Sequence, residues 1–166
     1  TATATYSVGQ AALFREGARG RSGRVDATVD LRPTAALRTS IQFTRLALGR
    51  ARDGSEYSRE TIPRAKVEYQ LSRSIFVRAI GQYASRTREP LVDATGNRIL
   101  VGGVLDTGER SNEFQIDWLF SYRPSPGTLF YFGYGATMTE ADQFRFSNLS
   151  RSRDGFFAKL SYLFRL

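Results

Sequence analysis

The chain has 166 residues, which is long enough for one domain with a sizeable core and too short to expect two. Its 24 lysines and arginines exceed its 16 acidic residues and give a formal charge of +8, and every cation except Lys66 and Lys159 is an arginine. It has neither cysteine nor histidine, which excludes disulfides, zinc and iron-sulfur clusters, and nucleophiles activated by an imidazole. No apolar run of about 18 residues is present, so a transmembrane helix is excluded, and the first residues, TATATYSVGQ, lack the features of a cleavable signal.

Apolar and polar residues alternate along most of the chain, whereas helical periodicity is hard to find. In FQIDWLFSY, for example, every second residue is aromatic or aliphatic. A period of two indicates a strand with two unlike faces. We predict eight strands, over residues 3–15, 24–32, 37–44, 65–71, 77–83, 113–123, 130–138 and 156–166.

Short and long connections alternate between these strands. The second, fourth and sixth strands are followed by RPTA, LSRS and RPSPG, which are rich in turn-forming residues. The other strands are followed by EGARGRSG, GRARDGSEYSRET, TREPLVDATGNRILVGGVLDTGERS and TEADQFRFSNLSRSRDG. We therefore expect an up-and-down meander with four long loops at one end and both termini at the other.

Bacterial outer-membrane barrels sort their loops in this way, on an even number of strands of about 9–11 residues. A closed sheet also leaves no backbone N–H or C=O unpaired in lipid. The sequence thus predicts an all-β protein with a single domain over residues 1–166, an eight-stranded antiparallel up-and-down transmembrane β-barrel. The alternative is a soluble barrel of lipocalin or avidin type, whose apolar face surrounds a ligand.

In a membrane barrel the apolar strand faces would contact lipid. The residues expected there are Phe114, Ile116, Trp118, Phe120, Phe130, Phe132, Leu160 and Phe164. Tyrosines near the strand ends would form the two aromatic girdles at the membrane interfaces. These are Tyr122 and Tyr162 towards the short turns, and Tyr83 and Tyr134 towards the long loops.

The polar strand faces would then line the interior. An eight-stranded barrel is just wide enough for its side chains to fill, and charges buried there must pair. We expect a closed lumen that contains an ion-pair network. Its predicted members are Arg24, Asp26, Asp30, Arg38, Lys66, Glu68, Arg78, Glu113, Asp117, Arg123, Lys159 and Arg165.

The sequence does not favour an enzyme, and we expect no cofactor. Glu113 and Asp117 could act as an acid-base pair, but an ion-pair network is the commoner role for carboxylates on an inward face. Asp53, Ser55 and Glu56 fall short of a complete calcium motif, so we expect no metal site.

The arginines are scattered, and in the strands they lie on the face opposite the aromatic residues, which disfavours nucleic-acid binding. A better partner for those near the long loops is the anionic headgroup layer of the outer leaflet. The residues concerned are Arg15, Arg19, Arg21, Arg24, Arg50, Arg52, Arg151 and Arg153.

Four runs, VDATVDLRPTAALRTSIQFTR, RAKVEYQLSRSIFVRAIGQYASR, FQIDWLFSYRPSPGTLFYFGYG and FFAKLSYLFRL, carry a family resemblance. Together they resemble the C-terminal barrel of bacterial outer-membrane proteins that carry a carbohydrate-binding family 9-like module in front. The likeness covers most of residues 25–166. Its most specific parts are the terminal KLSYLFR and, within SYRPSPGT, the residues Tyr122, Arg123, Pro124, Pro126 and Gly127.

The resemblance implies a Gram-negative outer-membrane location, and the sorting of short turns and long loops predicts that both termini are periplasmic. The resemblance also implies that Tyr162, Phe164 and Leu166 form a signal for the barrel-assembly machinery, although many such signals end in Phe rather than Leu. Barrels of this family are longer, so the chain is either the last eight strands of a larger barrel or a shortened barrel that closes alone.

The expected role is a structural anchor or recognition scaffold that contacts outer-membrane lipid and subunits of envelope complexes. A transport pore, formed as part of a larger barrel or assembly, is the alternative.

Overall fold

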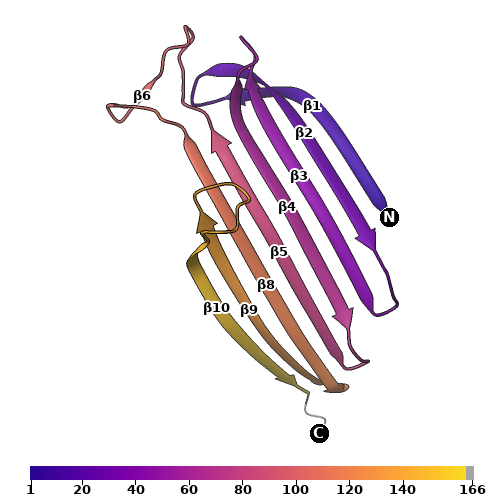
Figure 1. The fold of residues 1–166 in the computed structure, drawn as a ribbon. Helices are drawn as coiled ribbons and strands as arrows, with labels where there is room; N and C mark the ends of the chain where they lie inside the picture. The colour runs from indigo at the N-terminus through magenta and orange to yellow at the C-terminus, as the bar shows by residue number, and fades with distance from the viewer. Residues whose placement is uncertain (164–166) are drawn as a thin grey trace.

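The computed structural model describes residues 1–163 and is all-β, with one large antiparallel sheet and a small hairpin (Figure 1). The predicted strands are all present, and most are longer than expected. Phe164, Arg165 and Leu166 lie outside the described residues. The strands of the large sheet are β1 (Ala2–Leu13), β2 (Ala18–Leu31), β3 (Leu37–Arg50), β4 (Glu56–Gln70), β5 (Ile75–Arg88), β8 (Glu109–Ser125), β9 (Thr128–Glu140) and β10 (Ser150–Tyr162).

The large sheet has the order β1-β2-β3-β4-β5-β8-β9-β10, so each strand pairs with its neighbours in the chain. This confirms an eight-stranded antiparallel meander. The sheet is open, with β1 and β10 as its two edges. Thr1 bonds to Asp30 beside the β2–β3 turn, and the N–H of Leu163 bonds to Gly127 in the β8–β9 turn. The edge strands thus begin and end on the side of the short turns.

The connections at the other end correct one prediction. The loops after β5 and β9, residues 89–108 and 141–149, are long as expected. The connections after β1 and β3 are tight turns, because the predicted loop residues 18–23 and 56–61 belong to strands. Those residues are mostly polar, so alternation gives no signal there, yet their backbones continue the ladder, with Gly20 opposite Arg50.

The pairing register separates the side chains of the sheet into two faces. Residues opposite one another on neighbouring strands share a face. Val29 pairs with Ile41, for example, and Phe120 with Phe132, so the apolar positions form one face across the eight strands. Asp26 pairs with Thr44, and Arg38 with Glu68, on the opposite face. We call these the apolar face and the polar face.

The strands are staggered along the sheet. The row of paired residues that starts at Ala2 on β1 reaches Asp154 on β10. The short-turn end of β10, Tyr162, lies eight residues further along that strand. With a rise of about 3.3 Å per residue and a strand spacing of about 4.8 Å, this stagger over seven steps corresponds to a strand tilt of roughly 40°.

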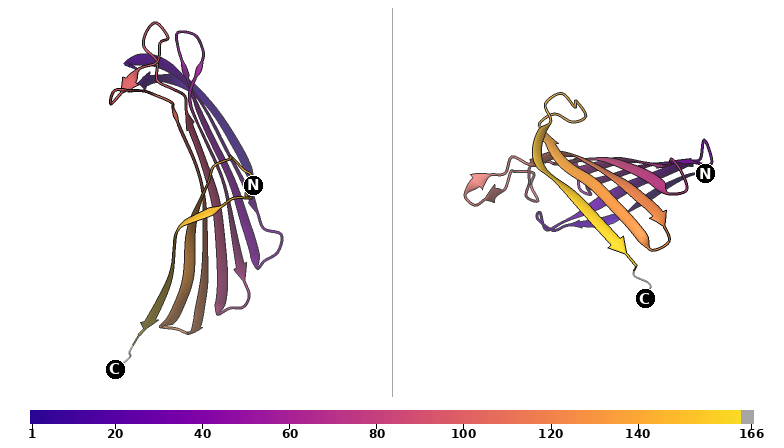
Figure 2. Two further views of the ribbon diagram at one scale, coloured as in Figure 1. Left: turned by 60° about the vertical axis from the view of Figure 1, so that its left-hand side comes forward. Right: turned by 90° about the horizontal axis from the view of Figure 1, so that it is seen from below.

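The sheet is twisted and coiled (Figure 2). Arg15, just after β1, lies 3.5 Å from Glu109, the first residue of β8, although four strands separate β1 from β8 in the sheet. In a flat sheet these two strands would be about 24 Å apart. Glu109 belongs to the polar face, since it pairs with Arg88 in the same alternation as Arg86 and Ser111. At the long-loop end the sheet therefore curls towards its polar face.

Candidate functional site

The polar face brings together part of the predicted ion-pair network. The guanidinium of Arg24 binds Asp26 at 2.6 Å, and Asp26 also accepts a hydrogen bond from Thr44. Lys66 lies 3.5 Å from Glu68, whose neighbours in register are Arg38 and Arg78. Arg38, Glu68 and Arg78 therefore alternate in sign across three strands, which is the favourable arrangement for cross-strand charges.

Other predicted members do not pair in the described sheet. Asp117 accepts a hydrogen bond from Gln115 at 2.9 Å rather than binding a cation. Asp30 lies with Arg38, Lys66 and Glu68 around a hollow near the short turns. Within residues 1–163, the members that form no ion pair are Asp30, Arg38, Arg78, Glu113, Asp117, Arg123 and Lys159.

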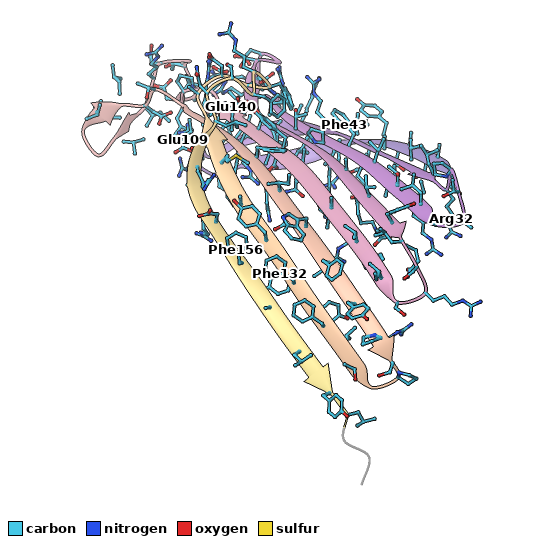
Figure 3. All side chains as sticks on the ribbon, turned by 60° about the horizontal axis from the view of Figure 1, so that its bottom comes forward. Arg32, Phe43, Glu109, Phe132, Glu140 and Phe156 are labelled. Atoms are coloured by element: carbon cyan, nitrogen blue, oxygen red, sulfur yellow. The ribbon has the colours of Figure 1, made fainter. Side chains whose placement is uncertain are left out.

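The apolar face is aromatic and largely uncovered (Figure 3). Phe132 lies between Trp118 and Phe156, at ring distances of 5.3 and 6.0 Å. Phe156 and Leu160 are each 70% exposed. The predicted lipid-contacting residues within the described chain all lie on this face, which is continuous from Tyr6 on one edge strand to Leu160 on the other.

The four predicted girdle tyrosines differ in their surroundings. Tyr122 and Tyr162 are exposed at the short-turn end. Tyr134 is partly covered and donates a hydrogen bond to Asp154 at 3.3 Å. Tyr83 is only 3% exposed, because the loop after β9 folds over it.

The loop after β9 covers the apolar face at its long-loop end. The hydroxyl of Tyr83 donates a hydrogen bond to Glu140 and accepts one from the N–H of Phe144. The rings of Phe144 and Phe146 lie 4.4 and 5.4 Å from that of Tyr83. Both phenylalanines remain at least 40% exposed, so this loop presents aromatic side chains where Tyr83 was expected to do so.

The long-loop end also contains a small core on the polar-face side. Leu13, Tyr57 and Leu91 are buried there, with Leu48 and Ile99 packed against them. We call these five residues the mouth core. Leu91 and Ile99 belong to the loop after β5, so this loop folds inward across the end of the sheet.

A buried ion pair holds the loop against the sheet beside the mouth core. Arg50 binds Glu16 at 2.6 Å, with 6% and 2% of their side chains exposed. The remaining guanidinium N–H groups donate to Ser55, to the carbonyl of Glu56 and to the carbonyl of Pro90 in the loop. Glu16 also accepts the backbone N–H of Val92. Arg50 was expected to meet lipid headgroups, and its burial shows that this prediction was wrong.

A second acidic residue, Asp106, holds the far end of the same loop. It binds Arg88 at 2.7 Å and accepts the N–H groups of Leu91 and Gly108. The hydrogen bonds from Arg88 and Leu91 hold the pKa of Asp106 well below its usual range. Burial acts to raise the pKa of Glu16, but the bonds from Arg50 and Val92 outweigh it and lower that pKa. Both groups therefore favour the ionised state.

The loop ends in an apolar hairpin beyond the sheet. Its strands are β6 (Leu100–Val101) and β7 (Val104–Leu105), and all four aliphatic residues are more than half exposed. Gly102 and Gly103 form the turn with φ of 61° and 85°, as a tight hairpin turn requires. A second turn, over Asp93–Gly96, is closed by the pairing of Val92 with Arg98.

Comparison with known protein families, curated proteins and solved structures finds no match. No helix in residues 1–163 is long and apolar enough to span a membrane. The same residues contain no group of three or more acidic side chains placed to hold a metal ion. Asp53 instead accepts hydrogen bonds from Ser55, which lower its pKa to about 2.

Sequence reasoning missed the ion pairs near the long-loop end. Besides Arg50 and Glu16, these include Glu60 and Arg86, 2.5 Å apart on the polar face. Both lie where β4 and β5 continue beyond the predicted strands. The only available signal was the alternation itself. Continued along the chain, it places Glu60 and Arg86 on the same face as Lys66 and Arg78.

Proposed function

We propose that the chain forms a bacterial outer-membrane β-barrel, with an ion-paired lumen and its termini in the periplasm, that serves as a structural anchor or recognition scaffold. The observation that carries this proposal is the apolar face, which extends across eight strands and exposes its aromatic rings. Soluble monomers rarely expose contiguous apolar patches larger than a few hundred Å². Acyl chains are a covering that matches this face in chemistry and extent.

The direction of curl favours lipid outside over a ligand inside. The contact between Arg15 and Glu109 indicates that the open sheet curls towards its polar face, with the apolar face on the convex side. A lipocalin-like barrel would curl the other way, around its apolar side chains. The strand tilt of roughly 40° also falls within the range of about 35–45° found in membrane barrels.

The free edges support closure or extension of the sheet. β1 and β10 are long strands with unpaired N–H and C=O groups, which a membrane cannot leave unsatisfied. In an even-numbered meander the first and last strands run antiparallel, so they can pair directly. The same edges could also join further strands of a larger barrel.

The test is folding in detergent. We expect a β-rich species, identified by circular dichroism, whose gel mobility differs between unboiled and boiled samples. Folding to a monomer in plain buffer, without detergent, would contradict the proposal and favour a soluble ligand-binding barrel.

A transport pore is the second candidate. Arg38 and Arg78 form no ion pair within residues 1–163, and charged groups of this kind line water-filled channels when a barrel is wide. Steady single-channel conductance in a planar bilayer would favour this role over the scaffold.

A further inference from the structure

The apolar face changes character abruptly near the long loops. Alternation and register place Arg19, Arg21, Arg45, Arg59 and Arg110 on this face, and all five side chains are exposed. They lie on β2, β3, β4 and β8. We call these five residues the outer arginine belt. On the described part of this face, no charged side chain lies nearer the short turns than Arg45 and Asp154, each eight residues from the short-turn end of its strand.

The height of the belt follows from the strand tilt. At roughly 40°, each residue advances about 2.5 Å along the barrel axis, so about ten residues cross the apolar band of about 25 Å. Arg45 lies eight residues from Leu37, and Arg21 lies ten residues from Leu31, each counted from the short-turn end of its strand. Arg45 and Arg21 therefore stand at the boundary of the band on the long-loop side, and Arg19, Arg59 and Arg110 lie beyond it, towards the loops.

Most arginines of the belt lack a carboxylate partner in the described residues. Arg19, Arg21, Arg45 and Arg110 form no ion pair within residues 1–163, whereas Arg59 binds Glu56. The neighbouring carboxylates of this face are already engaged. Glu140 accepts from Tyr83 and from the N–H of Phe146, and Asp154 binds Arg151 at 3.1 Å. Arg86, at a similar height on the polar face, is in contrast paired with Glu60 within the protein.

We infer that the outer arginine belt binds the phosphate groups of lipids in the outer leaflet. Guanidinium groups bind phosphate through paired, charge-assisted hydrogen bonds, and they remain charged at any physiological pH. The exposed rings of Phe144 and Phe146 lie on the same face and suit the boundary between headgroup and acyl chain. At the short-turn end of this face the strands carry Tyr122 and Tyr162 and, within residues 1–163, no arginine or lysine, whereas Arg32 and Arg73 lie in the turns. The two leaflets would therefore meet different surfaces. This inference rests on the proposed membrane orientation.

The test uses the full chain folded in an uncharged detergent, with lipid A as the probe and its dephosphorylated form as the reference. Native mass spectrometry gives the affinity of each lipid. We expect the Arg21→Gln, Arg45→Gln double variant to bind lipid A about tenfold more weakly, because two cations at the membrane boundary are lost. Its affinity for the dephosphorylated lipid should not change.

The matched control is the Arg32→Gln, Arg73→Gln double variant, which removes two charges at the short-turn end. It should keep the wild-type affinity for lipid A. Equal binding by the two variants, each with the heat-dependent mobility of a folded barrel, would overturn the belt and leave the proposed function standing. Failure of the wild-type chain to fold in detergent would overturn both.

Discussion

Arg50 and Glu16 form a buried ion pair, 2.6 Å apart, between the end of β3 and the turn after β1. The pair also anchors the loop after β5, through the carbonyl of Pro90 and the N–H of Val92. The loop after β5 is thus held across the long-loop end of the polar face. A ligand or solute approaching from the long-loop side would meet this loop first.

Replacing Glu16 with Gln should loosen the loop, because the buried guanidinium of Arg50 would lose its counter-charge. Breaking such a pair costs about 3 kcal/mol, or roughly a hundredfold faster hydrogen exchange for the amides of Leu91 and Val92. The control is Asp142→Asn, which breaks the exposed pair with Arg145 and should change exchange little. Unchanged exchange in Glu16→Gln would show that the pair does not hold the loop.

Acid should release the same loop. The pKa values of Glu16 and Asp106 are lowered in the folded protein from usual values of 4.5 and 3.8. Their contribution to stability is therefore complete above those values and is lost as the pH falls through the lower, folded pKa values. Amide resonances of Leu91, Val92 and Gly108 in detergent should shift below about pH 4.5. Amides in the middle of the sheet, such as Ala79, should not follow.

An arginine introduced in the middle of the apolar face should lower the free energy of unfolding. Trp118→Arg places a charge near the centre of β8 on the side assigned to lipid, and should lower the free energy of unfolding by about 2–4 kcal/mol. Gln115→Arg, on the polar face of the same strand and close to Asp117, should cost less than about 1 kcal/mol. Urea titrations in lipid vesicles measure both. A larger loss for Gln115→Arg would reverse the assignment of the faces.

The two edge strands should pair in a predictable register. Residues that face inward must meet other inward residues, so the total stagger must be even, at about eight or ten residues. Lys159 then lies opposite Thr5 for a stagger of eight and opposite Ser7 for ten. Because the chain lacks cysteine, Lys159→Cys can be combined with Thr5→Cys or Ser7→Cys and the disulfide measured. Only one pair should cross-link efficiently.

The control for this experiment is Lys159→Cys combined with Thr28→Cys on β2, which should not cross-link. If neither edge pair forms a disulfide in the folded protein, the strands do not close on each other. Disulfides between chains would then indicate that β1 and β10 complete a larger assembly.

Glu68 distinguishes the scaffold from the pore. It lies 3.5 Å from Lys66, and its neighbours in register are Arg38 and Arg78. In a filled lumen, Glu68→Gln would leave clustered cations and lower the free energy of unfolding by about 2 kcal/mol. In a pore, water would screen those cations, and the variant would instead increase selectivity for anions. Urea unfolding and bilayer conductance of the same variant separate the two roles.

The sequence alone determined the strands, their order and their faces. Strict alternation in FQIDWLFSY and its counterparts predicted each strand, and turns such as RPSPG predicted how consecutive strands meet. A period of two places each side chain of an extended chain on one face or the other, so no tertiary information was needed. The same signal placed Asp26 and Lys66 on the polar face. In the structure Asp26 pairs with Arg24, and Lys66 pairs with Glu68.

Only the tertiary structure decided what lies at the long-loop end. There the side chains are polar on both faces, so alternation could not show that β2 and β4 continue. Nor could it show that Arg50 turns inward to Glu16 while Arg45 remains exposed on the apolar face. These contacts depend on the register of strands far apart in the chain, on the curl that brings Arg15 to Glu109, and on the inward fold of the loop after β5.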